Sequence, residues 1–313
     1  MYQIGIDIGG TTVKAGLVKE GRILSWKSVD TDVDAGADKV IADIAGLVNA
    51  LKDDAGDKII TGVGIGCPGA VNSCSGVVDQ AYNLKWEYVP LGEKMQRLTG
   101  YPTRVCNDAN AAALGEAKYG AGKTYKSSVF ITIGTGIGSG IIIDGRLFEG
   151  NQSKGAEIGH VVIKSGGEPC TCGRRGCFEA YSSATALIRD TRRAMLRNKT
   201  SKLWEVCPNI DDVNGKTVFD AMLMGDRAAK RVFDNYITML GEGLVNIINA
   251  LRPEAIILGG GVCAQGDVLL TPLKKYIAKY SFGEGPHVGL HTATLKNDAG
   301  IIGAAALVAW ADN

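Results

Sequence analysis

One short segment concentrates side chains that bind metal ions. Between Glu157 and Glu179, the spacing H-x9-C-x-C-x4-C offers one imidazole and three thiols, from His160, Cys170, Cys172 and Cys177. Three thiolates and one imidazole are a donor set for a closed, tetrahedral, structural zinc site. The alternative is a group of buried thiols with a surface histidine nearby. The clustering favours zinc, which would fix a loop whose flanking polar groups, Glu157, His160 and Glu179, face a polar ligand.

Composition excludes several classes of protein. The chain has 313 residues, 45% hydrophobic and 21% charged, which suggests one large or two moderate soluble domains. A net charge of +1 gives no basic surface for nucleic acid or membrane. No apolar run approaches the roughly 18 residues of a membrane span, and the N-terminus, MYQIGIDIGG, lacks a signal-peptide pattern. Clustered cysteines fit metal binding in a reducing compartment better than disulfides, so we expect a cytoplasmic location.

Two segments, residues 2–18 and 129–143, share one plan: a strand, a tip of glycine and threonine, and a second strand. Neither is a Walker P-loop or a Rossmann fingerprint, because both of those need a helix after the glycines. Backbone N–H groups at such a tip can approach a phosphate, although a plain tight turn is the alternative for either segment alone. The repetition favours two related lobes, each with a phosphate-approaching tip.

Asp108 stands between a short strand, Thr103–Cys106, and an alanine-rich helix, Ala109–Lys118. This position suits a helix N-cap and a catalytic base equally well. Residues 70–89 are rich in turn residues and predict a loop region that could offer polar groups to a ligand. Arg227–Leu251 has the apolar periodicity of a long helix.

A strand over Ala255–Leu258 ends in a glycine triplet. Ligands of open α/β sheets bind beyond the carboxyl ends of strands, so bare backbone at this position suits a flat ring. A helix over Ser183–Asn198 carries several arginines, which we interpret as a solvated basic face.

The chain resembles the ROK family (repressors, uncharacterised open reading frames and sugar kinases) of the actin-like and hexokinase-like ATPase superfamily. The resemblance covers essentially the whole length. It is carried by DIGGTTVK at 7–14, GIGCPGAV at 64–71, NDANAAALGE at 107–116, IGTGIGSGI at 133–141, EIGH at 157–160, CTCGRRGC at 170–177 and LGGG at 258–261. Within the family, PGAVN and the YNLKW at 82–86 are most similar to bacterial glucokinases.

The resemblance implies an α/β fold of the two-lobed actin-like/hexokinase-like (ribonuclease H-like) kind with a structural zinc loop. Residues 1–118 would form the N-terminal lobe, with a last helix over 298–313 packing back on it. Residues 119–297 would form the C-terminal lobe that contains the zinc loop. The lobes would lie around a cleft.

The resemblance also implies residue roles. Asp108 would accept the proton of the 6-hydroxyl of a sugar as that hydroxyl attacks the γ-phosphate of ATP, with Asp7 helping to hold Mg²⁺. His160 would bind zinc through one ring nitrogen and face the sugar with the other. The implied sugar-binding residues are Asn83, Asn107, Asp108, Glu157, His160 and Glu179. The implied ATP-binding residues are Asp7, Gly9, Gly10, Thr11, Thr12, Lys14, Thr135, Gly136, Gly259, Gly260 and Gly261.

The implied activity is ATP-dependent phosphorylation of glucose at the 6-hydroxyl. Another hexose or N-acetylhexosamine (N-acetylmannosamine, N-acetylglucosamine, allose or fructose) is the first alternative, and polyphosphate or another nucleotide is an alternative donor. A sugar-sensing repressor is disfavoured because the first hairpin starts at Tyr2, which leaves no room for a winged helix-turn-helix before it. A sugar-binding protein without catalysis is disfavoured by the presence of Asp7 and Asp108. The family habit implies a homodimer or homotetramer.

Overall fold

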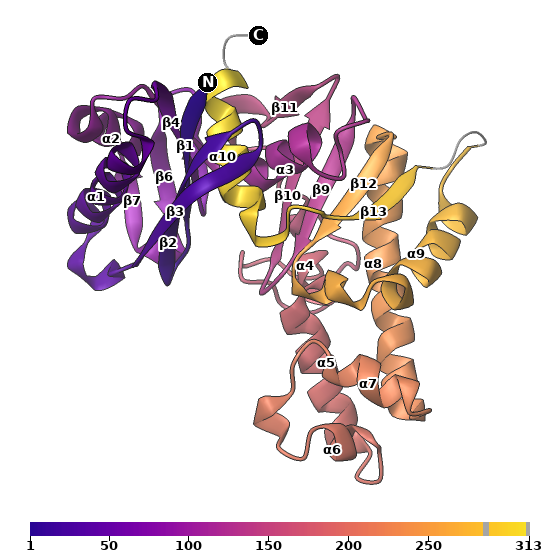
Figure 1. Cartoon of the computed structure of the whole chain (residues 1–313). Coiled ribbons are helices and arrows are strands. Elements are labelled where there is room, and N and C mark those ends of the chain that lie inside the picture. The colour runs from indigo at the N-terminus through magenta and orange to yellow at the C-terminus, as the bar shows by residue number, and fades with distance from the viewer. Residues whose placement is uncertain (284–287, 311–313) are drawn as a thin grey trace. The chain divides into compact units, whose positions relative to one another are not determined.

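The computed structural model describes residues 1–283 and 288–310 and shows a mixed α/β chain (Figure 1). The chain divides into two compact units, described separately below. The first unit comprises Met1–Phe130, Gly140–Ala156 and Ala293–Asn313, and the second comprises Ile131–Ser139 and Glu157–Thr292. The lobe boundary expected after Lys118 stays a prediction, and residues 311–313 of the expected last helix lie outside the described residues.

The first unit is built on a five-stranded sheet with the order β3-β2-β1-β4-β8. Its strands are β1 (Tyr2–Ile8), β2 (Thr12–Lys19), β3 (Arg22–Asp30), β4 (Ile60–Cys67) and β8 (Thr103–Asn107). β1, β2 and β3 pair antiparallel, whereas β1, β4 and β8 pair parallel. Apolar residues alternate along β1, and Ile4, Ile6 and Ile8 are buried. The hairpin expected over residues 2–18 is therefore confirmed.

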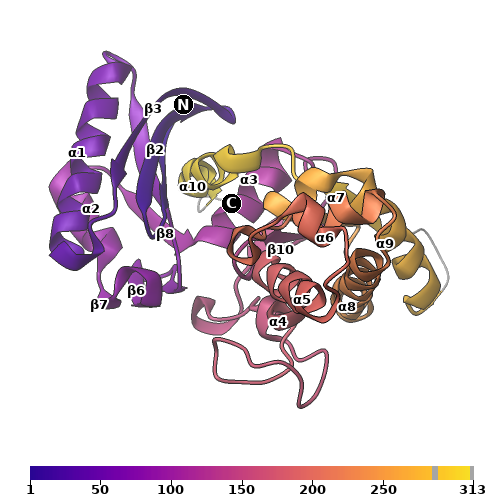
Figure 2. The same ribbon diagram turned by 90° about the horizontal axis from the view of Figure 1, so that it is seen from below.

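Helices cover both faces of this sheet, as Figures 1 and 2 show. α1 (Ala37–Ala55) packs on β2 and β3, while α10 (Ala299–Trp310) packs on β1, β4 and α3 (Asp108–Tyr119). α10 approaches the strands so closely that only glycine fits beneath it. A β-carbon on Gly5 would lie 1.9 Å from the Ile301 carbonyl oxygen, and one on Gly64 would lie 1.7 Å from the Ala304 carbonyl oxygen.

Residues 70–89 form a small antiparallel sheet, so the loop predicted there was wrong. The strands are β5 (Ala70–Asn72), β6 (Val77–Ala81) and β7 (Trp86–Val89), joined by the 3-10 turn η2 (Tyr82–Leu84) and followed by α2 (Leu91–Thr99). Val71, Val78 and Trp86 are buried in the core of the first unit. Strands of three to five residues are too short to show a clear alternation in the sequence.

A second five-stranded sheet has the order β11-β10-β9-β12-β13. Its strands are β9 (Ser128–Ile133), β10 (Ile137–Ile143), β11 (Arg146–Phe148), β12 (Ala255–Gly259) and β13 (Gly289–Thr292). β9 and β10 flank the second glycine and threonine tip, which confirms the repeated plan of strand, tip and strand. Short 3-10 turns connect many elements: η1 (Val33–Ala35), η3 (Asn151–Ser153), η4 (Ile158–His160), η5 (Ile210–Asp212), η6 (Gly261–Gln265) and η7 (Lys296–Asp298).

The second unit is rich in helices, of which α5 and α8 lie side by side in Figure 2. α8 has the bounds that the sequence predicts, Arg227–Leu251. The helices of this unit are α4 (Glu179–Ser182), α5 (Ala184–Arg197), α6 (Leu203–Val206), α7 (Thr217–Leu223), α8 and α9 (Asp267–Tyr280). Over residues 1–283 and 288–310, none of the helices has both the length and the apolarity that a membrane span requires.

Candidate functional site

The carboxyl ends of the parallel strands in the first unit bring two acidic residues to one edge of the sheet. Asp7 lies near the end of β1, and Asp108 follows the end of β8 as the first residue of α3. β4 lies between these strands, with Gly66 opposite Asp7 on one side and Cys106 on the other. The backbones at the two aspartates are therefore about two strand spacings, or roughly 10 Å, apart. This edge is where open α/β sheets bind ligands.

Burial perturbs both carboxyl groups. Desolvation raises the pKa of Asp7 to about 6, the negative charge of Asp108 adds to this rise, and Lys14 on the neighbouring strand opposes it. Burial likewise raises the pKa of Asp108, against the hydrogen bond that it accepts from the Ala109 backbone N–H. A raised pKa makes a carboxylate a better proton acceptor near neutral pH. Two such carboxylates also suit a divalent cation that binds oxygen ligands.

The N-cap of α3 is Asn107, which leaves Asp108 inside the first turn. The Asn107 carboxamide oxygen accepts hydrogen bonds from the backbone N–H groups of Ala109 (2.9 Å) and Asn110 (3.3 Å). Its Nδ2 donates to the Gly69 carbonyl at 3.1 Å. The structure therefore decides against the N-cap interpretation of Asp108. Both ends of the Asn107 side chain hold protein groups, and its contact with a sugar stays a prediction.

The first tip, Gly9–Thr12, is closed by a hydrogen bond from the Gly9 N–H to the Thr12 carbonyl at 3.0 Å. Thr31, just after β3, holds the tip from the side: its N–H donates to the Thr11 carbonyl at 2.9 Å and its hydroxyl to the Gly9 carbonyl at 2.8 Å. Asn83, an exposed residue of η2, lies against Gly10, where an added β-carbon would be 3.6 Å from the Asn83 Cβ. One predicted sugar-binding residue thus adjoins the predicted phosphate tip.

The second tip, Gly134–Ile137, is held by the start of two helices. The Gly134 N–H donates to the Gly136 carbonyl at 3.0 Å. From α5, the Ala184 N–H donates to the Gly134 carbonyl at 2.9 Å and the Thr185 hydroxyl to the Thr135 carbonyl at 2.8 Å. From α4, the Glu179 Oε2 accepts the Ile137 N–H at 2.9 Å.

The glycine triplet after β12 lies beside this second tip. Gly260 has φ +91° and sits so close to β9 that a β-carbon would lie 2.3 Å from the Ile133 carbonyl oxygen. Gly259 ends β12 and Gly261 begins η6. The structure therefore brings together, within the second unit, the tip predicted to approach a phosphate and the glycines predicted to suit a flat ring.

The four predicted zinc ligands come together. The ligand atoms of His160, Cys170, Cys172 and Cys177 all lie within 4.8 Å of one another. The Cys172 and Cys177 sulfurs are 3.7 Å apart, and the Cys170 sulfur is 3.6 Å from the His160 Nδ1. With zinc–sulfur bonds of about 2.3 Å, tetrahedral geometry places two sulfurs about 3.8 Å apart. The donor set and its spacing therefore fit a structural zinc ion.

Glu179 connects the zinc loop with the second tip. Its Oε1 accepts hydrogen bonds from the Thr171 hydroxyl (3.2 Å) and the Cys170 thiol (3.7 Å), while its Oε2 takes the Ile137 N–H. Because the His160 Nδ1 faces the thiols, Nε2 is the ring nitrogen left for another partner. Glu157, at the start of η4, is exposed.

Comparison with known proteins adds the decisive observation: the sequence matches the ROK family over residues 3–310. The chain belongs to the ROK family. A glucokinase of Thermotoga maritima is 37% identical over 97% of this chain and 96% of its own length. A glucokinase of Halalkalibacterium halodurans is 38% identical over 100% of this chain and 96% of its own. The crystal structure of a ROK family glucokinase from Streptomyces griseus, in complex with glucose and AMPPNP, has a TM-score of 0.82, with 35% identity over 98% of this chain and 99% of that one.

The residues predicted for this ROK family member fall into two groups. Those in the first unit are Asp7, Gly9, Gly10, Thr11, Thr12, Lys14, Asn83, Asn107 and Asp108. Those in the second unit are Thr135, Gly136, Glu157, His160, Cys170, Cys172, Cys177, Glu179, Gly259, Gly260 and Gly261. Sequence reasoning missed Thr31, Ala184 and Thr185, which hold the two tips. Nothing in the local periodicity marks these residues, because each acts through a partner far along the chain.

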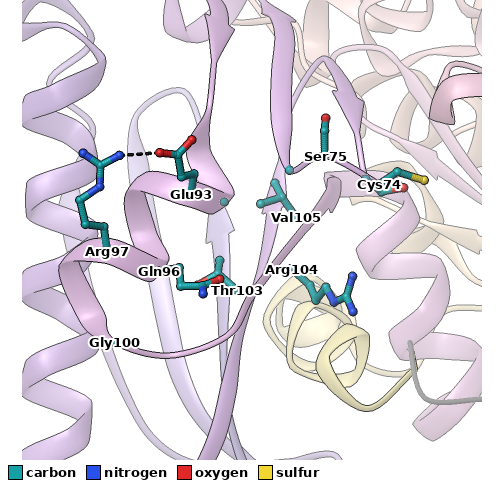
Figure 3. A pocket seen from close by; sticks show the side chains of 12 residues that line it. Cys74, Ser75, Glu93, Gln96, Arg97, Gly100, Thr103, Arg104 and Val105 are labelled. Carbon is teal, nitrogen blue, oxygen red and sulfur yellow. Dashed lines mark hydrogen bonds and ion pairs between the residues drawn. The ribbon is translucent and has the colours of Figure 1, made fainter.

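The first unit also contains a pocket, which lies between α2, β8 and the turn after β5 (Figure 3). Its volume is about 580 Å³, and its lining includes Cys74, Gln96 and Arg104. Arg97 points to Glu93 at its rim, and the two form an ion pair at 2.6 Å. None of the predicted site residues lines this pocket, which is therefore distinct from the candidate site.

Proposed function

We propose that this ROK family member transfers the γ-phosphoryl group of ATP to the 6-hydroxyl of glucose. The observation that carries the proposal is Asp108: Asn107 and not Asp108 is the N-cap of α3, and the Asp108 carboxyl group is buried, has a raised pKa, and lies at the carboxyl edge of the sheet that also holds Asp7. Glucose as the acceptor is supported by the relatives named glucokinase at 37% and 38% identity. ATP as the donor is supported by the AMPPNP in the Streptomyces griseus complex.

The proposed reaction is an in-line phosphoryl transfer. The oxygen of the 6-hydroxyl attacks the γ-phosphorus, its proton passes to the Asp108 carboxylate, and ADP leaves with the electrons of the broken P–O bond. Such reactions depend mainly on positioning and on charge neutralisation. Backbone N–H groups of the two tips would supply part of that neutralisation. Mg²⁺, bound with help from Asp7, would supply the rest.

Recognition of the sugar is proposed for the polar side chains of Asn83, Asn107, Glu157, His160 and Glu179. A hexose presents several hydroxyl groups, and a site that pairs each of them rejects an epimer that leaves one polar group unpaired. The cluster of His160 and three cysteines would hold a structural Zn²⁺ that keeps His160 and Glu179 in place. A homodimer or homotetramer is proposed on the family resemblance, and a cytoplasmic location is proposed on the clustered cysteines.

A coupled assay of ADP release with Mg-ATP tests the function directly. The acceptor panel is glucose, mannose, fructose, allose, N-acetylglucosamine and N-acetylmannosamine. We expect glucose to have by far the highest kcat/KM. A higher value for an N-acetylhexosamine would refute glucose as the substrate while leaving the kinase chemistry in place. If no acceptor is phosphorylated with ATP, other nucleotides, or with polyphosphate measured by sugar phosphate formation, the kinase proposal fails.

A further inference from the structure

The second tip is held from one short stretch of chain. Glu179, Ala184 and Thr185, here called the clasp, make three hydrogen bonds to the four residues Gly134–Ile137. The N–H groups in the first turn of a helix have no partner within the helix. The N–H of Ala184, the first residue of α5, instead donates to the Gly134 carbonyl. The tip is thereby attached to the start of α5.

Thr185 is the member of the clasp whose role is least expected. It is exposed to solvent, yet its hydroxyl donates to the Thr135 carbonyl at 2.8 Å. This bond orients the peptide group that joins Thr135 and Gly136, because the carbonyl of residue 135 and the N–H of residue 136 belong to the same rigid plane. The direction of the Gly136 N–H thus depends on Thr185.

Glu179, the first residue of the clasp, also contacts the zinc loop. One Glu179 oxygen accepts a hydrogen bond from the Ile137 N–H, and the other accepts one from the hydroxyl of Thr171, which lies between two residues of the zinc cluster. Gly136 lies against the Glu179 carboxylate, because a β-carbon on it would be 2.2 Å from the Glu179 Oε2. A displacement of the zinc loop would therefore be passed to the tip.

We propose that Thr185 is a positioning residue for the nucleotide phosphates, and that the clasp makes nucleotide binding depend on the zinc loop as well as on the tip itself. This inference rests on the proposed function, in which the second tip binds the ATP phosphates. It assigns to the zinc loop a second task besides shaping the sugar pocket.

The first test compares Thr185→Val with Thr185→Ser. Valine keeps the shape but removes the hydroxyl, and its exposed position leaves the core unchanged. We expect the Kd for Mg-AMPPNP, measured by titration calorimetry without glucose, to rise roughly three- to tenfold in Thr185→Val, the effect of one lost hydrogen bond. The KM for ATP should rise similarly while kcat changes little, and Thr185→Ser should restore both values. Thr200→Val, at another exposed threonine of the second unit, is the control and should match the unaltered protein.

The second test uses Thr171→Val, which removes one hydrogen bond to Glu179 but none of the four zinc-site side chains. We expect an unchanged zinc content, measured by mass spectrometry of the metal, and a raised Kd for Mg-AMPPNP. An unchanged Kd in either valine variant, or a failure of Thr185→Ser to restore affinity, would overturn the inference. If the unaltered protein does not bind Mg-AMPPNP, the proposed function itself fails.

Discussion

The two glycine and threonine tips share a plan but are supported in different ways. The first tip is held by Thr31, which follows the strand next to its own hairpin, through one backbone and one side-chain hydrogen bond. The second tip is held by α4 and α5, which follow the zinc loop. The first tip is thus stabilised within a single sheet, whereas the second depends on a loop that has a metal-site donor set. Similar local sequences can therefore have unequal sensitivity to a distant change.

The largest effect is expected on kcat, from a substitution of Asp108, which lies in the same unit as the first tip. Asp108→Asn keeps the size of the side chain but removes the proton acceptor, so kcat should fall about 10²-fold or more. Steady-state kinetics measures this, with zinc content and glucose affinity as controls. Zinc content should be unchanged, since Asp108 lies in the first unit and the cysteines in the second. Glucose affinity should change little, because the asparagine side chain can still accept a hydrogen bond from the 6-hydroxyl. A near-normal kcat would remove Asp108 from the role of base.

Removal of one thiol from the zinc cluster tests whether the second tip depends on the zinc loop. Cys172→Ser removes a ligand of the four-residue cluster, and we expect it to lose zinc together with most of its affinity for glucose. Affinity for Mg-AMPPNP should also fall through the clasp. The matched control is Cys74→Ser, because Cys74 is an exposed cysteine of the first unit outside the cluster. Retained glucose affinity in metal-free Cys172→Ser would show that the zinc loop does not shape the sugar pocket.

A matched pair of alanine variants compares the tips directly. A β-carbon on Gly136 would lie 2.2 Å from the Glu179 Oε2, whereas one on Gly10 would meet nothing closer than 3.6 Å. Gly136→Ala should therefore lower the free energy of unfolding by about 1–3 kcal/mol. Gly10→Ala should change it by no more than about 0.5 kcal/mol. Denaturant unfolding of both variants gives the comparison, and equal losses would contradict the difference in packing.

The last prediction concerns the pH dependence of stability. The folded-state pKa of Asp7 is raised to about 6 from 3.8, chiefly by burial. Folded protein then binds more protons than unfolded protein between about pH 4 and pH 6, so this group lowers stability as pH rises through that window. Asp7→Asn should be more stable than the unaltered protein above pH 6, by at most about 3 kcal/mol, and the advantage should vanish near pH 4. Thermal unfolding across pH in magnesium-free buffer measures this, and an advantage independent of pH would contradict it.

Local patterns in the sequence predicted much of the fold. The alternating residues of β1, the apolar periodicity of α8 and the spacing of the zinc cluster each depend on residues that are close in the chain. The sheet over residues 70–89 was missed because its strands are short. The helix cap could not be assigned to Asn107 or Asp108 in advance, since both residue types cap helices well. The contacts of Thr31 and Thr185 join distant segments, which periodicity does not report.

The close packing of α10 on Gly5 and Gly64 has a consequence for folding during translation. β1 leaves the ribosome long before α10, yet the two pack against each other. The face of the sheet formed by β1 and β4 therefore stays uncovered while the segments between β4 and α10 are translated. Contacts of such long sequence separation slow folding and expose apolar surface to aggregation. The first unit can therefore complete its core only after α10 has been translated.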